Sequence, residues 1–79
     1  MEKLTKLIAR VLNVDESILN DASSPETISE WDSLNGILLV IELEKKFNVK
    51  FTIDEVVAVQ KISDIKDALR RHNVKEDNI

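Results

Sequence analysis

The chain has 79 residues, which is enough for one small domain, and its apolar fraction of 43% is typical of a globular protein. A net charge of −4 disfavours sequence-independent nucleic-acid binding, which needs a basic face. The absence of cysteine excludes disulfides and thiolate chemistry, and a single histidine excludes a histidine-rich metal site. No apolar run reaches the ~20 residues that span a bilayer. The N-terminus also lacks the pattern of a signal peptide. We therefore expect a soluble cytoplasmic domain without a membrane span.

The first predicted element is a helix at the start of the chain. Five apolar residues repeat at the spacing of a helix with one buried stripe, namely Leu4, Leu7, Ile8, Val11 and Leu12. The helix is expected to end near Asn13, because asparagine tolerates the left-handed conformation at a helix end. A long polar connection with one short turn follows over residues 14–31. Long loops inside small domains are often functional.

A second helix is predicted from Asp32-Ser33-Leu34 to about Phe47, with Asp32 or Ser33 as its cap. It has apolar residues on two sides. The side assigned to the core runs the full length and comprises Gly36, Leu39, Val40, Leu43 and Phe47. The opposite side comprises Leu34, Ile37, Leu38 and Ile41. Two interpretations of the second side stay open: it packs under the long loop, or it is a docking surface for partner proteins.

Two further helices are predicted near the end of the chain. Thr52 and Glu55 have the spacing of a capping box, which predicts a short helix to about Ala58. The β-branched residues around it leave a strand over 51–59 as the alternative. The last helix is expected to begin at a cap formed by Ser63 or Asp64. Its inward residues are expected to be Ile65, Ala68 and Leu69.

The last helix is expected to end at Arg70-Arg71-His72, where positive charge suits the helix C-terminus and His72 is solvated. Residues 1–73 are predicted to form one domain, and residues 74–79 a frayed tail. The predicted fold class is all-α. It is a small four-helix bundle of three longer helices and one short helix, with a long loop between the first and second helices.

The tripeptide Asp32-Ser33-Leu34 is more informative in its position than on its own, because it follows a long loop and begins the second helix of a small acidic chain. In this arrangement the chain resembles the acyl carrier proteins. The resemblance covers about residues 4–72. It extends to three further segments, which are Asn20-Asp21-Ala22-Ser23, Leu39-Val40 with Leu43-Glu44 through Phe47, and Ile62-Ser63-Asp64-Ile65.

By this resemblance, Ser33 carries a covalent 4′-phosphopantetheine arm derived from coenzyme A, which holds acyl or aminoacyl intermediates as thioesters. Asp32 would help to position the divalent metal of the phosphopantetheinyl transferase. The position suits this role, because a phosphodiester is stabilised at a helix N-terminus. The resemblance implies a protein that is not an enzyme and has no catalytic residues or metal site of its own.

The resemblance also implies partners, which are the phosphopantetheinyl transferase, an acyl-loading ligase or acyltransferase, and a downstream synthase or transferase. The chain is expected to be a monomer that does not bind nucleic acid and does not span a membrane. The residues assigned to the partner surface are Trp31, Leu34, Leu38, Ile41, Glu44 and Lys45. Trp31 is predicted to be either a core residue or a wall that steers the arm.

The chain departs from the common acyl carrier pattern at three places. Glu30-Trp31 replaces the usual Gly-Ala, Leu38 stands where carriers of fatty-acid synthesis usually have an acid, and Lys45-Lys46 interrupts the acidic run. These departures favour a carrier of a specialised biosynthetic pathway. The alternatives are a carrier of primary fatty-acid synthesis and a helical protein–protein interaction module without a prosthetic group. A serine hydrolase is disfavoured, because Gly-x-Ser-x-Gly is absent.

Overall fold

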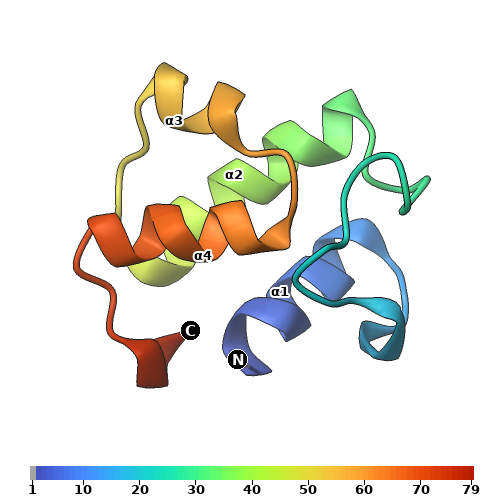
Figure 1. Ribbon diagram of the computed structural model, residues 1–79, viewed down its shortest axis with the longest axis horizontal. Coiled ribbons are helices and arrows are strands. Elements are labelled where there is room, and N and C mark those ends of the chain that lie inside the picture. The colour runs from blue at the N-terminus through green and yellow to red at the C-terminus, as the bar shows by residue number, and fades with distance from the viewer. Residues whose placement is uncertain (1) are drawn as a thin grey trace.

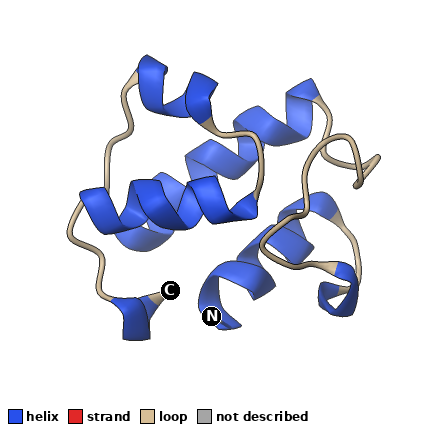
Figure 2. Cartoon of the chain, in the orientation of Figure 1, coloured by secondary structure: helices blue, strands red, loops and turns tan. Residues whose placement is uncertain are grey.

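The structure is a computed structural model that describes residues 2–79, which form helices, turns and loops without a strand (Figure 2). The α-helices described are α1 (Glu2–Leu12), α2 (Ser33–Phe47), α3 (Ile53–Ala58) and α4 (Ile62–Arg71). Two short 3₁₀ helices, η1 (Glu16–Ile18) and η2 (Glu76–Asn78), lie in the long loop and near the chain end. The predicted all-α class is confirmed, and the alternative of a strand over 51–59 is wrong.

The core lies where α1, α2 and α4 meet. Its buried residues are Leu4, Leu7, Ile8 and Leu12 of α1, Leu39 and Leu43 of α2, and Ile62, Ile65 and Leu69 of α4, together with Ile28, Trp31 and Ile79. The short helix α3 has no buried residue and lies at the side of the bundle away from both termini (Figure 1). Packing in the core therefore holds the three longer helices, and α3 must be held by other contacts.

Asparagine ends three of the four α-helices in the described chain. Asn13 after α1, Asn48 after α2 and Asn73 after α4 have φ angles of 58°, 54° and 67°. This left-handed conformation is usually taken by glycine, and asparagine is the next most tolerant residue. The sole glycine, Gly36, lies inside α2 instead. The predicted end of the first helix at Asn13 is confirmed.

The helix α4 begins at Ile62, before the predicted cap. Its N-cap residue is Lys61, which forms no side-chain hydrogen bond to the helix. The prediction that Ser63 or Asp64 caps this helix is therefore wrong. Both residues lie inside the first turn of α4.

The long loop supplies the missing acceptors for α4. The backbone N–H of Ile62 donates to the carbonyl of Ser23 at 3.0 Å, and that of Ser63 donates to the carbonyl of Asp21 at 3.0 Å. The buried ammonium of Lys66 pairs with the carboxylate of Asp21. These contacts hold the loop against the start of α4, and they satisfy N–H groups that a helix leaves unpaired at its N-terminus.

Residues 74–79 pack against the bundle. The side chain of Ile79 is only 3% exposed, and its carbonyl accepts a hydrogen bond from the N–H of Leu4 at 2.7 Å. The Arg70 guanidinium binds both carboxylate oxygens of Glu76 at 2.8 and 2.9 Å. Both ends of the chain accordingly lie together (Figure 1). The expected frayed tail is therefore wrong, because the segment ends in a buried apolar residue.

Candidate functional site

The N-terminus of α2 is fixed by two hydrogen bonds. The Oδ1 atom of Asp32 accepts from the backbone N–H of Asn35 at 2.8 Å, which confirms Asp32 as the helix cap. The Asn35 side-chain amide donates to the carbonyl of Glu30 at 2.8 Å. The second bond ties the last residues of the long loop to the first turn of the helix. The chain therefore enters α2 in one defined direction.

Ser33 is the first residue of α2, and its side chain is exposed. Among residues 2–79 its Oγ has no hydrogen-bond partner. The first backbone N–H groups of a helix have no intrahelical acceptor, and the helix dipole favours negative charge beside them. An exposed, unpaired hydroxyl at this position can be modified, and a phosphodiester on it would be stabilised electrostatically. The surroundings of Ser33 therefore suit a group that is attached to its hydroxyl through a phosphodiester.

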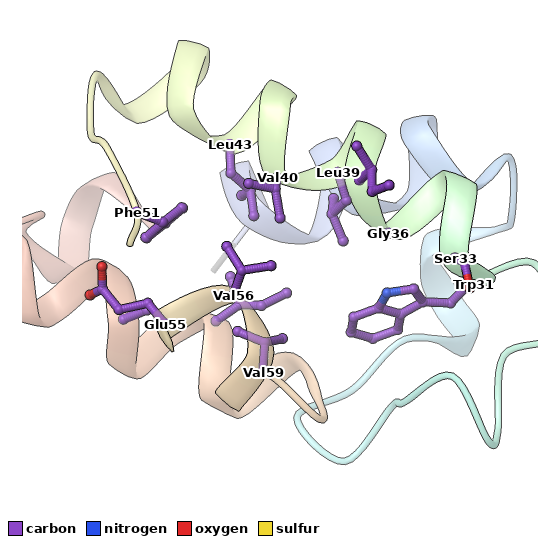
Figure 3. A pocket seen from close by; sticks show the side chains of 13 residues that line it. Trp31, Ser33, Gly36, Leu39, Val40, Leu43, Phe51, Glu55, Val56 and Val59 are labelled. Atoms are coloured by element: carbon purple, nitrogen blue, oxygen red, sulfur yellow. The ribbon is translucent and has the colours of Figure 1, made fainter. Parts of the chain in front are cut away.

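A cavity of about 230 Å³ opens beside Ser33, between α2, α3 and α4 (Figure 3). Its walls are mainly apolar and include Leu39, Val40 and Leu43 of α2 and, opposite them, Val56 and Val59. This volume holds roughly seven groups of the size of a water molecule. An apolar space of this size next to an attachment point can shelter a short hydrocarbon chain.

Trp31 closes the end of the cavity next to Ser33. The residue is 7% exposed, and its indole ring points into the cavity below α2 (Figure 3). A Cβ atom added to Gly36 would lie 3.6 Å from the indole Nε1. Trp31 is thus a core residue that also forms a cavity wall. Its assignment to the partner surface is wrong, because the ring points inward and leaves no exposed face.

Glu55 lines the opposite end of the cavity and caps α3. Its carboxylate accepts from the backbone N–H of Thr52 at 2.8 Å, and the Thr52 Oγ1 accepts from the backbone N–H of Glu55 at 3.1 Å. The predicted capping box is confirmed. The bond from Thr52 is the main cause that lowers the pKa of Glu55, and the bond to His72 lowers it further.

His72 connects α3 to the end of α4. Its Nε2 lies 2.9 and 3.0 Å from the two carboxylate oxygens of Glu55. Its ring meets the ring of Phe51 edge to face, with centroids 5.3 Å apart. The expectation of a solvated His72 is therefore wrong, because Phe51 and Glu55 cover it. These contacts hold α3, which has no buried residue of its own, over the cavity.

The second apolar side of α2 is exposed. Leu34 is 66%, Leu38 42% and Ile41 45% exposed, and we name these three residues the apolar face. The interpretation that the long loop covers this side is wrong. The structure adds Ile53 and Val57 of α3, which are also largely exposed and which sequence analysis did not assign to any surface. In the sequence, these two residues belong to the β-branched segment 51–59, whose apolar residues could have been recognised as a surface.

The two charged residues assigned to the partner surface differ in their surroundings. The half-buried Glu44 accepts a hydrogen bond from the backbone N–H of Phe51 at 2.9 Å, so its carboxylate holds the turn after α2. Lys45 is exposed, and its Nζ lies 3.7 Å from a carboxylate oxygen of Glu42. Of the two, Lys45 has the side chain that a partner could reach.

The chain matches the family described as "Phosphopantetheine attachment site" over residues 2–69. It is 31% identical over 68 residues to the acyl carrier protein of Thermosynechococcus vestitus, covering 85% of this chain and 83% of that protein. The chain belongs to the acyl carrier protein family. It is also 28% identical over 75 residues to the acyl carrier protein of Buchnera aphidicola subsp. Schizaphis graminum, covering 94% of each chain. Another Buchnera aphidicola acyl carrier protein, from subsp. Acyrthosiphon pisum, is 28% identical over 76 residues, or 95% of this chain and 94% of that one.

Membership of the acyl carrier protein family defines the cofactor. Acyl carrier proteins are carriers rather than catalysts, and this one carries covalently attached 4′-phosphopantetheine. They work together with partner enzymes such as transferases and synthases. Among residues 2–79, none of the helices has the length and apolar character needed to cross a membrane.

Proposed function

We propose that Ser33 carries the 4′-phosphopantetheine arm and that this acyl carrier protein presents acyl groups to partner enzymes from that position. The observation that carries the proposal is the exposed, unpaired Oγ of Ser33 at the first turn of α2, beside an apolar cavity. When attached, the arm supplies the terminal thiol that a cysteine-free chain lacks. The protein supplies the position, the electrostatic environment and the shelter.

Asp32 has two roles in this proposal. Its Oδ1 caps α2 and fixes the backbone around Ser33. Its Oδ2 has no hydrogen-bond partner among the described residues, and the side chain is exposed. A free carboxylate oxygen next to the acceptor hydroxyl can bind the divalent metal of the phosphopantetheinyl transferase. In this way Asp32 of the carrier protein would assist the transferase in attaching the arm to Ser33.

The cavity is proposed to take the acyl chain when the protein is loaded. Its volume suits a chain of roughly six to eight carbons, at about one water-sized volume per group. Withdrawal of the chain into apolar surroundings is favoured by about 0.8 kcal/mol for each buried methylene. Because α3 has no buried residue, it is the element that can yield to a longer chain.

The apolar face, Leu34, Leu38 and Ile41, is proposed as the docking surface for the transferase and for the loading and accepting enzymes. Leu38 is exposed where carriers of fatty-acid synthesis usually have an acid, so partners would bind here by apolar contact more than by charge. This feature favours a specialised biosynthetic pathway over primary fatty-acid synthesis, and we propose that the pathway is cytoplasmic. Exposed Lys45 would select partners with an acidic patch.

The attachment site is tested by intact-mass measurement. The purified chain is incubated with coenzyme A and a promiscuous phosphopantetheinyl transferase, and we expect a gain of one phosphopantetheine group. Ser33→Ala should abolish the gain and keep the helical circular-dichroism spectrum. Ser17→Ala is the matched control, because Ser17 is also an exposed serine in the first turn of a helix, and this variant should be modified like the wild type.

Two results would contradict the proposal. Modification that persists in Ser33→Ala would place the attachment site elsewhere. An unmodified wild-type chain under conditions that modify another carrier protein would favour the alternative of an interaction module without a prosthetic group.

A further inference from the structure

A second hollow lies at the end of α2 that is remote from Ser33. It has a volume of about 480 Å³ and is formed by the turn after α2, the segment after α4 and the start of α1. Three lysines line it, which are Lys3, Lys46 and Lys75, and we name it the basic hollow. Of the described residues, no aspartate or glutamate lines it. Such a concentration of positive charge is unexpected in a chain whose net charge is −4.

The protein does not neutralise these lysines itself. Among residues 2–79, neither Lys46 nor Lys75 has an ion pair. The Nζ atom of Lys3 donates to the side-chain oxygen of Asn78 at 2.9 Å, which is a neutral partner and leaves the positive charge in place. Three like charges around one hollow repel each other, and an anion placed between them removes this repulsion.

Carboxylates close to the lysines in the sequence are engaged elsewhere. Glu42, one helical turn before Lys46, lies 3.7 Å from Arg10 and 3.7 Å from Lys45. Glu76, next to Lys75, binds the guanidinium of Arg70 with both of its oxygens. The positive charge of the basic hollow is therefore available to a partner.

The rest of the lining indicates which kind of anion fits. The half-buried side chains of Phe47, Val49 and Val74 form an apolar wall between the lysines. Proteins usually hold a compact phosphate with helix N-terminal N–H groups or with an arginine fork. Here α2 and α4 present their C-terminal ends, and no arginine of the described chain lines the hollow. Separate ammonium groups beside an apolar wall suit separate carboxylates with an apolar side chain among them.

We propose that the basic hollow is a second docking surface, and that its partner is an acidic segment of another protein with an apolar side chain among its carboxylates. The helix α2 has 15 residues and is therefore about 20 Å long. A segment bound where α2 and α4 end leaves Ser33, at the other end of α2, uncovered (Figure 1). An enzyme held at this surface would keep Ser33 at a high effective concentration without blocking it.

The probe is a fluorescein-labelled pentapeptide of four glutamates around one leucine, and the control peptide has glutamine in place of each glutamate. Binding to the full chain is measured by fluorescence anisotropy at low salt. We expect the glutamate peptide to bind and the glutamine peptide not to bind. Affinity for the glutamate peptide should fall several-fold between about 50 and 500 mM salt, because exposed charges are screened. In a proton–nitrogen NMR spectrum, the peptide should shift the amide signals of Asn48, Val49, Asn73 and Val74.

Two double variants with the same change in net charge locate the site. Lys46→Gln/Lys75→Gln removes two lysines of the basic hollow, and we expect about a tenfold loss of affinity at about threefold for each exposed contact. Lys6→Gln/Lys61→Gln is the matched control, because both lysines are exposed and lie outside the hollow. We expect this control to bind within about twofold of the wild type, since it keeps all three contacts. Circular dichroism verifies that both variants are folded.

Equal losses in the two double variants, or equal binding of the two peptides, would overturn the proposal. Amide shifts confined to the apolar face would overturn it as well. Tighter binding of inorganic pyrophosphate than of the glutamate peptide at the same four amides would identify a phosphate site instead. The inference does not depend on attachment at Ser33, because the unmodified chain should bind the peptide as well as the chain that carries the arm.

Discussion

Replacing the apolar face separates docking from stability. The double variant Leu38→Ala/Ile41→Ala removes two large side chains that are 42% and 45% exposed. We expect it to fold with a modest loss of stability and to be a poorer substrate for the transferase and for acyl-loading enzymes. The physical reason is that a side chain already half in water leaves no enclosed cavity when it is truncated.

The expected loss in free energy of unfolding follows from how much of each side chain is buried. Full burial of a leucine or isoleucine contributes about 1.5–3 kcal/mol, so the buried half of each side chain accounts for about 1 kcal/mol. Alanine offsets a few tenths of a kcal/mol of this loss by its higher helix propensity. The double variant should therefore lose about 1–1.5 kcal/mol in its free energy of unfolding. A domain of this size has about 4–12 kcal/mol in total.

Leu43→Ala is the matched control on the opposite side of the same helix. Leu43 is 2% exposed, and truncating a buried leucine costs about 2–5 kcal/mol. A loss of 1 kcal/mol lowers the melting temperature of such a domain by about 4–8 °C. The single substitution Leu43→Ala should therefore lower the melting temperature by at least about 8 °C relative to the wild type, and by more than the double variant does.

The assay combines thermal melting followed by circular dichroism with the rate of phosphopantetheine transfer at equal protein concentration. Melting of the double variant as low as that of Leu43→Ala would show that Leu38 and Ile41 belong to the core. Unchanged transfer and loading rates would refute the docking role.

Two further predictions concern α3 and the chain end. The pKa of Glu55 is lowered by the Thr52 backbone N–H and by His72. The ionised Glu55 carboxylate therefore stabilises the folded protein fully above its ordinary pKa of 4.5, and this stabilisation is lost as the pH falls through the lowered pKa of the folded state. Thermal melts from pH 7 to pH 3 should therefore show a gap between wild type and Glu55→Gln that closes below about pH 4.5, and a gap independent of pH would contradict this. Ile79→Ala should cost about 2 kcal/mol in urea unfolding, because Ile79 is buried, whereas Ile53→Ala, at the exposed start of α3, should cost almost nothing. Equal effects of the two isoleucine variants would show that the chain end contributes no packing.

Features that depend on nearby residues could be predicted from the sequence. The buried stripes of α1 and α4 follow from apolar spacing, and the Thr52–Glu55 capping box follows from two residue types three positions apart. Asp32 as the cap of α2 is of the same kind. In each case the interacting groups lie within one or two helical turns, so the local pattern contains the information.

Features that depend on residues far apart in the sequence could not be predicted in this way. The acceptors that replace a cap on α4 come from Ser23 and Asp21, and the partner of Ile79 is Leu4 at the other end of the chain. His72 is covered because Glu55 and Phe51 meet it across the bundle. The cavity is a further case, since its volume depends on the separation of α2 from α3 and α4 rather than on composition.

Capping of α4 by the long loop has a consequence for the order of folding. The bonds from Ile62 to Ser23 and from Ser63 to Asp21 join parts of the chain that lie about 40 residues apart. Closing a loop of that length costs about 3 kcal/mol in chain entropy, which must be offset before these contacts stabilise anything. The first turn of α4 is therefore completed late, after α1 and α2 have brought the loop into place. Once folded, the amide hydrogens of Ile62 and Ser63 exchange with solvent only when the loop detaches, so they report its opening.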